Sequence, residues 1–193
     1  MTRTLVFGGA RSGKSAFAEQ LAAQSGREVV YLATARAGDG EMATRIALHR
    51  RQRPAVWQTV EEPLLLADAL RRWRAPERVV LVDCLTLWLS NLLFSEQVEH
   101  PDVGDIALPA LFHAQRAALL ETLERWTESD GDVIFVSNEV GMGIVPYGAI
   151  SRAFTDEAGR LNQAVAAACE RAVFVAAGLP LVLKGTLPGG APC

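Results

Sequence analysis

Cysteine is scarce in this sequence, and no two cysteines lie close together. The three are Cys84, Cys169 and Cys193, with no Cys-x-x-Cys pair among them. A disulfide framework needs an even set of thiols, and a cysteine zinc site needs closely spaced ones. The pattern therefore argues against both and favours a reducing compartment, so we expect a cytoplasmic protein.

Long hydrophobic runs are also absent. The longest apolar stretch, residues 172–183, contains Gly178 and Pro180. It falls short of the roughly 20 apolar residues that a membrane-spanning helix needs. Near the N-terminus, the apolar run at residues 5–7 ends in glycine and is too short for the core of a signal peptide. We therefore expect no membrane span and no signal peptide.

An excess of positive charge is missing as well. Lysine and arginine together number 19 against 22 acidic residues, the formal net charge is -3, and the arginines are scattered. A basic face is therefore not evident, and we expect no nucleic-acid partner. Half of the 193 residues are hydrophobic, which is typical of a globular protein. We expect one catalytic domain over residues 1–184, followed by a disordered glycine- and proline-rich tail at residues 185–193.

Short apolar runs alternate with longer helical patterns along the chain. Such runs, when helices separate them, are typical of a parallel sheet that is buried on both faces. The turn signal at residues 178–180 favours an antiparallel last strand. The pattern predicts an α/β protein with a mostly parallel sheet, helices on both faces and one antiparallel edge strand. The expected strands are Thr4–Phe7, Glu28–Ala33, Val56–Thr59, Val79–Val82, Asp132–Val136, Ala172–Ala176 and Leu181–Leu183, and the expected helices are Lys14–Gln24, Glu41–Arg51, Pro63–Trp73, Pro109–Glu128 and Phe154–Glu170.

A glycine-rich segment joins the first expected strand to the first expected helix. It matches G-x-x-x-x-G-K-[ST], the phosphate loop of nucleotide-binding enzymes. Glycines let successive backbone N–H groups point at phosphate oxygens, and the helix N-terminus adds partial positive charge. Lys14 would reach the β- and γ-phosphates of ATP or GTP, and Ser15 would ligate Mg²⁺. A glycine-rich turn without a ligand is the structural alternative. The expected nucleotide contacts here are Gly8, Gly9, Ala10, Arg11, Ser12, Gly13, Lys14 and Ser15.

A carboxylate follows another buried strand. In VVLVDCLT (79–86), four apolar residues precede Asp83. A carboxylate at the carboxyl end of a parallel strand can hold Mg²⁺ directly or through water. On its own, this pattern favours a strand-ending turn. Next to a phosphate loop it favours a metal role, so we predict that Ser15 and Asp83 together hold Mg²⁺.

A histidine precedes a cluster of arginines in EMATRIALHRRQRP (41–54). The spacing of His49 suits a partly buried core position, and the arginines suit the charged end of a helix. An imidazole beside several cations also suits a nucleophile that attacks a polyphosphate. Spacing alone leaves both interpretations open. His100 and His113 lie in a connector and in the following helix, and we expect surface or packing roles for them.

Several motifs resemble the bacterial bifunctional adenosylcobinamide kinase / adenosylcobinamide-phosphate guanylyltransferase family over about residues 4–184. The phosphate loop is shared by many nucleotide enzymes, whereas NEVGMGIVP and the H-x-x-x-R-P segment are much more specific. The matching segments are GGARSGKS (8–15), YLATA (31–35), EMATRIALHRRQRP (41–54), WQTVEEP (57–63), VDCLTLWLSNLLF (82–94), VSNEVGMGIVP (136–146) and DEAGRLNQ (156–163).

The resemblance implies a P-loop NTPase fold of the RecA-like type and two linked reactions. The first phosphorylates adenosylcobinamide with ATP or GTP, and the second transfers GMP from GTP to that phosphate, releasing pyrophosphate. It assigns the covalent GMP intermediate to His49, implies Lys14 as a catalytic residue and implies a homotrimer. The implied nucleotide contacts outside the phosphate loop are Ala33, Thr34, Ala35, Arg50, Arg51, Gln52, Arg53, Glu61 and Asp83.

The segment SNEVGMGIVP (137–146) follows an expected strand. Gly141 and Gly143 suggest turns with positive φ or close approach to a ligand. A loop at the carboxyl edge of a parallel sheet is where ligands bind, and the resemblance favours an active-site wall. Asn138 and Glu139 are therefore candidates to contact the nucleotide, the metal or the corrinoid.

Five other side chains allow two interpretations each. Trp88 and Phe94 suit core packing, or contact with a corrinoid or a neighbouring subunit. Arg160 and Asn162 match the family pattern, yet an exposed helix face explains them nearly as well. Glu61 precedes an expected helix, where acidic residues favour the helix dipole. The resemblance instead favours a nucleotide contact.

Two rival functions remain at this point. One is a P-loop kinase of another small alcohol, in which His49 is only structural. It would transfer a phosphoryl group without forming a covalent GMP adduct. The other is a nucleotide-dependent nucleic-acid-binding module of the recombinase-like type. Such a module needs a basic groove and salt-sensitive binding, which the net charge of -3 argues against.

Overall fold

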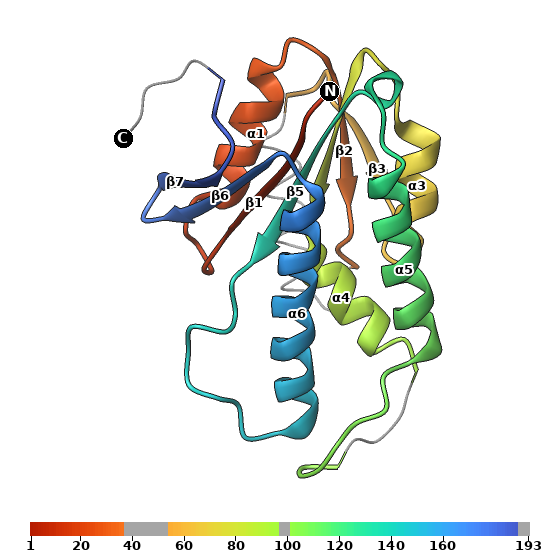
Figure 1. The fold of residues 1–193 in the computed structure, drawn as a ribbon, viewed down its shortest axis with the longest axis vertical. Coiled ribbons are helices and arrows are strands. Elements are labelled where there is room, and N and C mark those ends of the chain that lie inside the picture. The colour runs from red at the N-terminus through yellow and green to blue at the C-terminus, as the bar shows by residue number, and fades with distance from the viewer. Residues whose placement is uncertain (37–53, 97–100, 189–193) are drawn as a thin grey trace.

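The chain folds around one central sheet. The computed structural model describes residues 1–36, 54–96 and 101–188 (Figure 1). Within these ranges seven strands lie in the order β3-β2-β4-β5-β1-β6-β7. All neighbours pair in parallel except β6 and β7, which are antiparallel. The predicted sheet is thus confirmed. The strands are β1 (Arg3–Gly8), β2 (Glu28–Ala33), β3 (Gln58–Glu61), β4 (Arg78–Asp83), β5 (Asp132–Asn138), β6 (Arg171–Ala176) and β7 (Leu179–Lys184).

Helices cover both faces of the sheet, as predicted. Alternation along the strands sends Leu5 to one core cluster and Val6 to the other, and both are fully buried. Helix α1 packs on the face of Val6, while α3, α4, α5 and α6 pack on the face of Leu5 (Figure 1). None of the helices in the described ranges has the length and apolar character to cross a bilayer. The helices are α1 (Lys14–Gln24), α3 (Leu66–Trp73), α4 (Leu85–Leu93), α5 (Ala110–Glu124) and α6 (Ala149–Ala168).

Helix α3 begins later than the sequence pattern predicted. It starts at Leu66 rather than at Pro63. The Glu62 carboxylate accepts the backbone N–H groups of Leu64 and Leu65 at 3.0 and 2.8 Å, which holds a turn ahead of the helix. The acidic residue therefore organises the entry into α3 through hydrogen bonds.

Helix α4 was absent from the prediction. Its residues 85–93 read as an apolar stretch with few polar breaks, and Trp88, Leu89, Leu92 and Leu93 are at most 1% exposed. A helix that is apolar nearly all round gives no amphipathic period. The sequence therefore indicated that residues 85–93 are buried, but it did not indicate that they form a helix.

Other boundaries moved by smaller amounts. Strand β3 begins at Gln58 rather than Val56, which lies in a turn and is 87% exposed. Helix α6 begins at Ala149 rather than Phe154. Helix α5 ends at Glu124 rather than Glu128, and a short 3₁₀ helix, Glu128–Asp130, follows after an irregular turn. The predicted helix Glu41–Arg51 lies outside the described residues.

Candidate functional site

The phosphate loop forms the tight turn that its glycines predicted. Gly13 stands immediately before α1 with φ 94°, and Arg11 has φ 57°. These left-handed positions turn the backbone back on itself between β1 and the first residue of the helix, Lys14. Such alternation creates a concavity of N–H groups that binds anions. The loop thus presents a phosphate-binding conformation at the N-terminus of α1.

Neighbouring strands brace this loop from both sides. The N–H of Gly178, in the β6–β7 turn, donates to the Ser12 carbonyl at 2.8 Å. From the other side, the N–H of Glu139 donates to the Gly8 carbonyl at 3.0 Å. Gly8 has no room for a side chain, because a Cβ there would lie 2.2 Å from the carbonyl oxygen of Val175. The antiparallel β6–β7 hairpin therefore stabilises the conformation of the phosphate loop.

Lys14 is buried beside this loop without a formal ion pair among the described residues. It is 9% exposed, and its Nζ donates to the Gly9 carbonyl at 3.2 Å. Burial lowers the pKa of Lys14, and the nearby Cys84 and Asp83 offset this only in part. The ammonium is thus only partly compensated, and the phosphates of a nucleotide would supply further negative charge.

Asp83 ends β4 and lies close enough to Lys14 for its charge to act on that ammonium. Its Oδ2 accepts the phenol O–H of Tyr31 at 2.8 Å. The carboxylate is partly exposed, so it retains acceptor positions for a cation. An oxygen ligand at this place, with the hydroxyl of Ser15 at the start of α1, fits the donor set that Mg²⁺ prefers. No group of three or more His, Cys, Asp or Glu residues suited to a metal occurs within the described ranges.

The predicted contact Thr34 ties two strand ends together. Its Oγ1 donates to the Cys84 carbonyl at 2.7 Å and accepts the Cys84 N–H at 2.9 Å. Its carbonyl accepts the Asn91 amide of α4 at 2.7 Å. Thr34 is fully buried, so its side chain shapes the carboxyl edge and its neighbour Ala35 offers the more exposed surface.

Asn138 occupies a central position at the carboxyl edge of the sheet. The sequence indicated it only as one candidate contact. It ends β5, the strand between the phosphate-loop strand β1 and the Asp83 strand β4. Its N–H donates to Thr86 Oγ1 at 2.7 Å, and its carbonyl accepts the Asn162 amide at 3.1 Å. Two helices thus fix its backbone, and neither bond uses its side chain. Thr86 and Asn162 are the residues that sequence reasoning could not connect to it.

The structure brings most described candidates to one edge of the sheet. Ala33 pairs with Glu61 on β3 and with Asp83 on β4, so the ends of three strands meet there. The phosphate loop follows β1 at the same edge. His49 and the contacts Arg50, Arg51, Gln52 and Arg53 lie outside the described residues.

Two alternatives that the sequence offered were wrong. Gly141 and Gly143 do not have positive φ, so only their close approach to a ligand stays a prediction. Asn162 is 7% exposed, so an exposed helix face does not explain it. A buried, bonded amide that supports Asn138 explains it instead.

Three other side chains follow one of their two interpretations. Trp88 is fully buried and donates its indole N–H to the Leu64 carbonyl at 2.8 Å, which is a core role. His113 is exposed, as predicted. Phe94 is 54% exposed, which does not fit a core role.

Comparisons with known proteins agree with this geometry. The family model described as cobinamide kinase / cobinamide phosphate guanyltransferase matches residues 4–183. The bifunctional adenosylcobalamin biosynthesis protein CobP of Pseudomonas aeruginosa is 54% identical over 95% of this chain and 98% of its own length. The protein CobU of Escherichia coli is 41% identical over 93% and 98%.

A solved structure supports the fold alone. An ATPase of a bacterial type III secretion system superposes with a TM-score of 0.55 at 14% identity, over 94% of this chain and 56% of the ATPase. The sheet and the loop after β1 are those of P-loop NTPases. With the family model spanning nearly the whole chain and relatives of such identity, the chain belongs to the cobinamide kinase / cobinamide phosphate guanyltransferase family, a family of bifunctional enzymes.

Proposed function

We propose that this protein phosphorylates adenosylcobinamide with ATP or GTP and then transfers GMP from GTP to the new phosphate. The products of the second step are adenosylcobinamide-GDP and pyrophosphate. One observation carries the proposal: a member of this family holds a braced phosphate loop, with the partly compensated cation Lys14, next to the Asp83 carboxylate.

In the kinase step, the acceptor hydroxyl oxygen attacks the γ-phosphorus. The bond to the bridging oxygen breaks, the nucleoside diphosphate leaves, and the hydroxyl proton passes to water. Lys14 and the loop N–H groups would hold the charge that develops on the phosphate oxygens. Ser15 and Asp83 would hold Mg²⁺, which supplies neutralisation of the polyphosphate when bound. Asn138, at the end of the intervening strand, would orient the transferred group.

In the guanylyl step, a ring nitrogen of His49 attacks the α-phosphorus of GTP and pyrophosphate leaves. A phosphate oxygen of the acceptor then attacks the same phosphorus and frees the histidine. This assignment rests on the family resemblance, with Arg50, Arg51 and Arg53 as cations near the oxygens. We place the enzyme in the cytoplasm because of its few, scattered cysteines, and propose a trimer on the same resemblance.

The decisive experiment is intact-protein mass spectrometry after incubation with GTP and Mg²⁺. We expect wild-type protein to gain the mass of one guanylyl group and to lose it when adenosylcobinamide phosphate is added. His49→Ala should show no gain, whereas His113→Ala, which changes an exposed histidine on α5, should behave as wild type.

Labelling that survives His49→Ala would move the covalent step to another residue. Phosphoryl transfer to a different alcohol, with no guanylyl adduct under any condition, would instead favour a simple kinase. The first result would contradict the assignment of His49, and the second would contradict the guanylyl-transfer step.

A further inference from the structure

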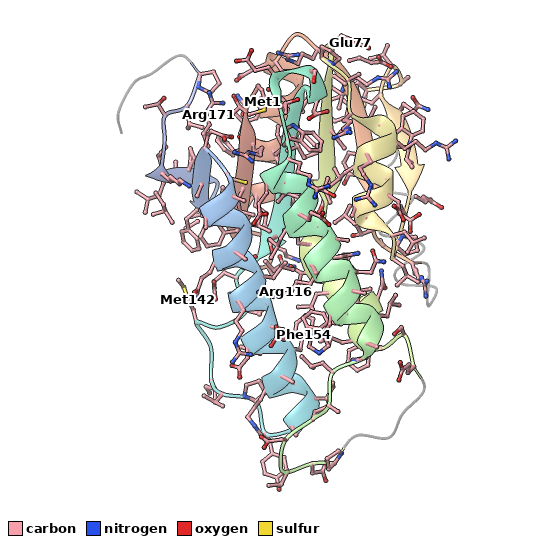
Figure 2. The ribbon with its side chains drawn as sticks, turned by 45° about the vertical axis from the view of Figure 1, so that its right-hand side comes forward. Met1, Glu77, Arg116, Met142, Phe154 and Arg171 are labelled. Atoms are coloured by element: carbon pink, nitrogen blue, oxygen red, sulfur yellow. The ribbon has the colours of Figure 1, made fainter. Side chains whose placement is uncertain are left out.

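A groove lies between α6 and the loop of residues 139–148 that leads into it. Its volume is about 480 Å³, within the range of small-molecule sites. Glu139, which opens this loop, donates its N–H to Gly8 of the phosphate loop at 3.0 Å. Phe154, on the other side of α6, packs toward the core and α5 (Figure 2). The groove therefore begins beside the nucleotide site, on a helix face that the core does not use.

One stripe of α6 forms the polar side of the groove. Arg152, Asp156, Arg160 and Gln163 follow each other at helical spacing of three or four residues and all line it. Arg152 is occupied, because its guanidinium donates to the carbonyls of Pro146 and Tyr147 and shapes the loop.

The other three side chains of the stripe, Asp156, Arg160 and Gln163, face solvent. Each has hydrogen-bond donors or acceptors that no described residue uses. Arg160 uses one nitrogen for Glu157 at 2.5 Å, and the rest of its donors point to no described partner. Within the described ranges, no side-chain hydrogen bond engages Asp156 or Gln163. Together they offer donors for carbonyl oxygens and acceptors for N–H₂ groups, which is the inventory that amide groups need.

The loop supplies the apolar side of the groove. Ile144 is 98% exposed and Val145 is 75% exposed, and both line it with Val140 and Pro146. Met142, at 78% exposed, stands on the outer side of the same loop (Figure 2). A contiguous run of exposed apolar side chains beside a concave surface marks a binding site.

The middle of the groove is kept open by Gly159. A Cβ at this position would meet no atom within 4 Å. A glycine inside a helix costs about 1 kcal/mol relative to alanine. No backbone contact and no positive φ requires glycine here, so the residue serves to leave space above the helix.

We infer that this groove binds the corrinoid part of the acceptor, an inference that rests on the proposed function. A corrinoid is a flat macrocycle with apolar faces and a rim of amide side chains. The loop side chains suit its face, the stripe of α6 suits its amides, and Gly159 leaves room for the ring. The link from Glu139 to Gly8 places the groove next to the phosphate loop, where the acceptor hydroxyl must arrive. The groove holds part of the macrocycle, and the remainder faces solvent.

The test uses dicyanocobinamide, a coloured and stable corrinoid, as the probe. Equilibrium dialysis gives its affinity for wild type, for Gly159→Leu and for Ala167→Leu. The leucine at 159 projects into the groove, whereas Ala167 is exposed on α6 and does not line it. We expect Gly159→Leu to weaken binding at least tenfold with an undiminished melting temperature, and Ala167→Leu to bind as wild type.

Three results would overturn parts of this picture. If wild type binds no corrinoid and phosphorylates none, the proposed function itself fails. If wild type binds it and Gly159→Leu binds equally well, the acceptor lies elsewhere and only the groove inference fails. If Gly159→Leu changes the sedimentation mass while affinity stays constant, the groove is a contact between copies of the chain. Arg160→Gln provides a second variant, and its loss of affinity without a change in mass supports the inference.

Discussion

The two edges of the central sheet use charged side chains in opposite ways. At the amino edge, where the parallel strands begin, acids and bases pair with one another across neighbouring elements. Each of these pairs fixes one strand end against another. They are Arg3 with Glu170 at 3.1 Å (Nε to Oε1), Arg27 with Asp132 at 3.0 Å and Arg78 with Glu28 at 3.0 Å.

At the carboxyl edge, polar groups lack such partners among the described residues. Lys14 donates to a neutral carbonyl, and the Ser12 hydroxyl is buried with no hydrogen bond. Asp83 is bonded to a phenol rather than to a cation. Unsatisfied buried polar groups are rare in folded proteins and cost stability. The contrast shows that the amino edge stabilises the fold, while the carboxyl edge holds its polar groups ready for a ligand.

The largest effect is expected from a substitution of Lys14, at the carboxyl edge of the sheet. Lys14→Met should lower the rate of phosphoryl transfer by roughly 100-fold or more, because it removes the cation that would face the phosphates in the proposed function. It should also raise the stability of the nucleotide-free protein by up to about 1 kcal/mol, since a buried charge with a lowered pKa is removed. Coupled-enzyme kinetics and thermal unfolding measure the two effects.

The matched control is Lys184→Met, at the other lysine of the sequence. Lys184 donates to the last carbonyls of α6 at 3.0 Å and lies on the edge strand β7. We expect normal kinetics and a slightly lower melting temperature. A stability loss in Lys14→Met as large as that of the control would contradict the distinction between the edges.

An intermediate effect is expected at the amino edge. Asp132→Ala removes an acceptor that binds the Thr2 N–H at 2.6 Å and the Arg27 guanidinium at 3.0 Å. We expect a loss of about 1–2 kcal/mol in the free energy of unfolding, with kcat unchanged. Denaturant titration measures the first quantity. A change in kcat larger than the change in folded population would show that the two edges are coupled.

The smallest expected effect is the pH dependence of the stability that Glu170 contributes at the amino edge. Burial alone would raise the pKa of Glu170, but hydrogen bonds from Arg3 outweigh it, so that pKa is lowered on folding. The stabilisation is therefore present above the ordinary carboxyl range near pH 4.3 and is lost as the pH falls through the lowered pKa. Because Glu170 is 40% exposed, we expect at most about 0.5 kcal/mol.

The measurement compares melting temperatures of wild type and Glu170→Gln from pH 7 down to pH 3. The difference should be constant near neutrality and should vanish in acid. A gap that widens as the pH falls would give Glu170 a raised pKa and would refute the assignment.

Local sequence predicted those parts of the fold whose causes are local. Helix α1 and strand β2 have the bounds that the sequence indicated, because glycine, lysine and an apolar run act within a few residues. Helix α4 escaped prediction since apolar residues on nearly all of its sides weaken the periodic signal in the sequence. The start of α6 escaped it since residues 149–153 carry no capping motif.

The candidate site likewise has parts that the local sequence predicted and parts that it did not. The phosphate loop and Asp83 were predicted from motifs, because each follows its own strand in the sequence. The support of Asn138 was not, since Thr86 and Asn162 come from two separate helices. The groove along α6 needs the loop folded back onto the helix, and no spacing rule describes that.

By itself, the sequence determined a phosphate-binding turn, a buried parallel sheet and membership of one enzyme family, because these depend on residues adjacent in the chain. Only the tertiary structure decided which polar groups stay unpaired. That choice depends on strand order, which places β5 between the phosphate loop and Asp83. It also depends on hydrogen bonds between residues far apart in the chain, such as Gly178 to Ser12.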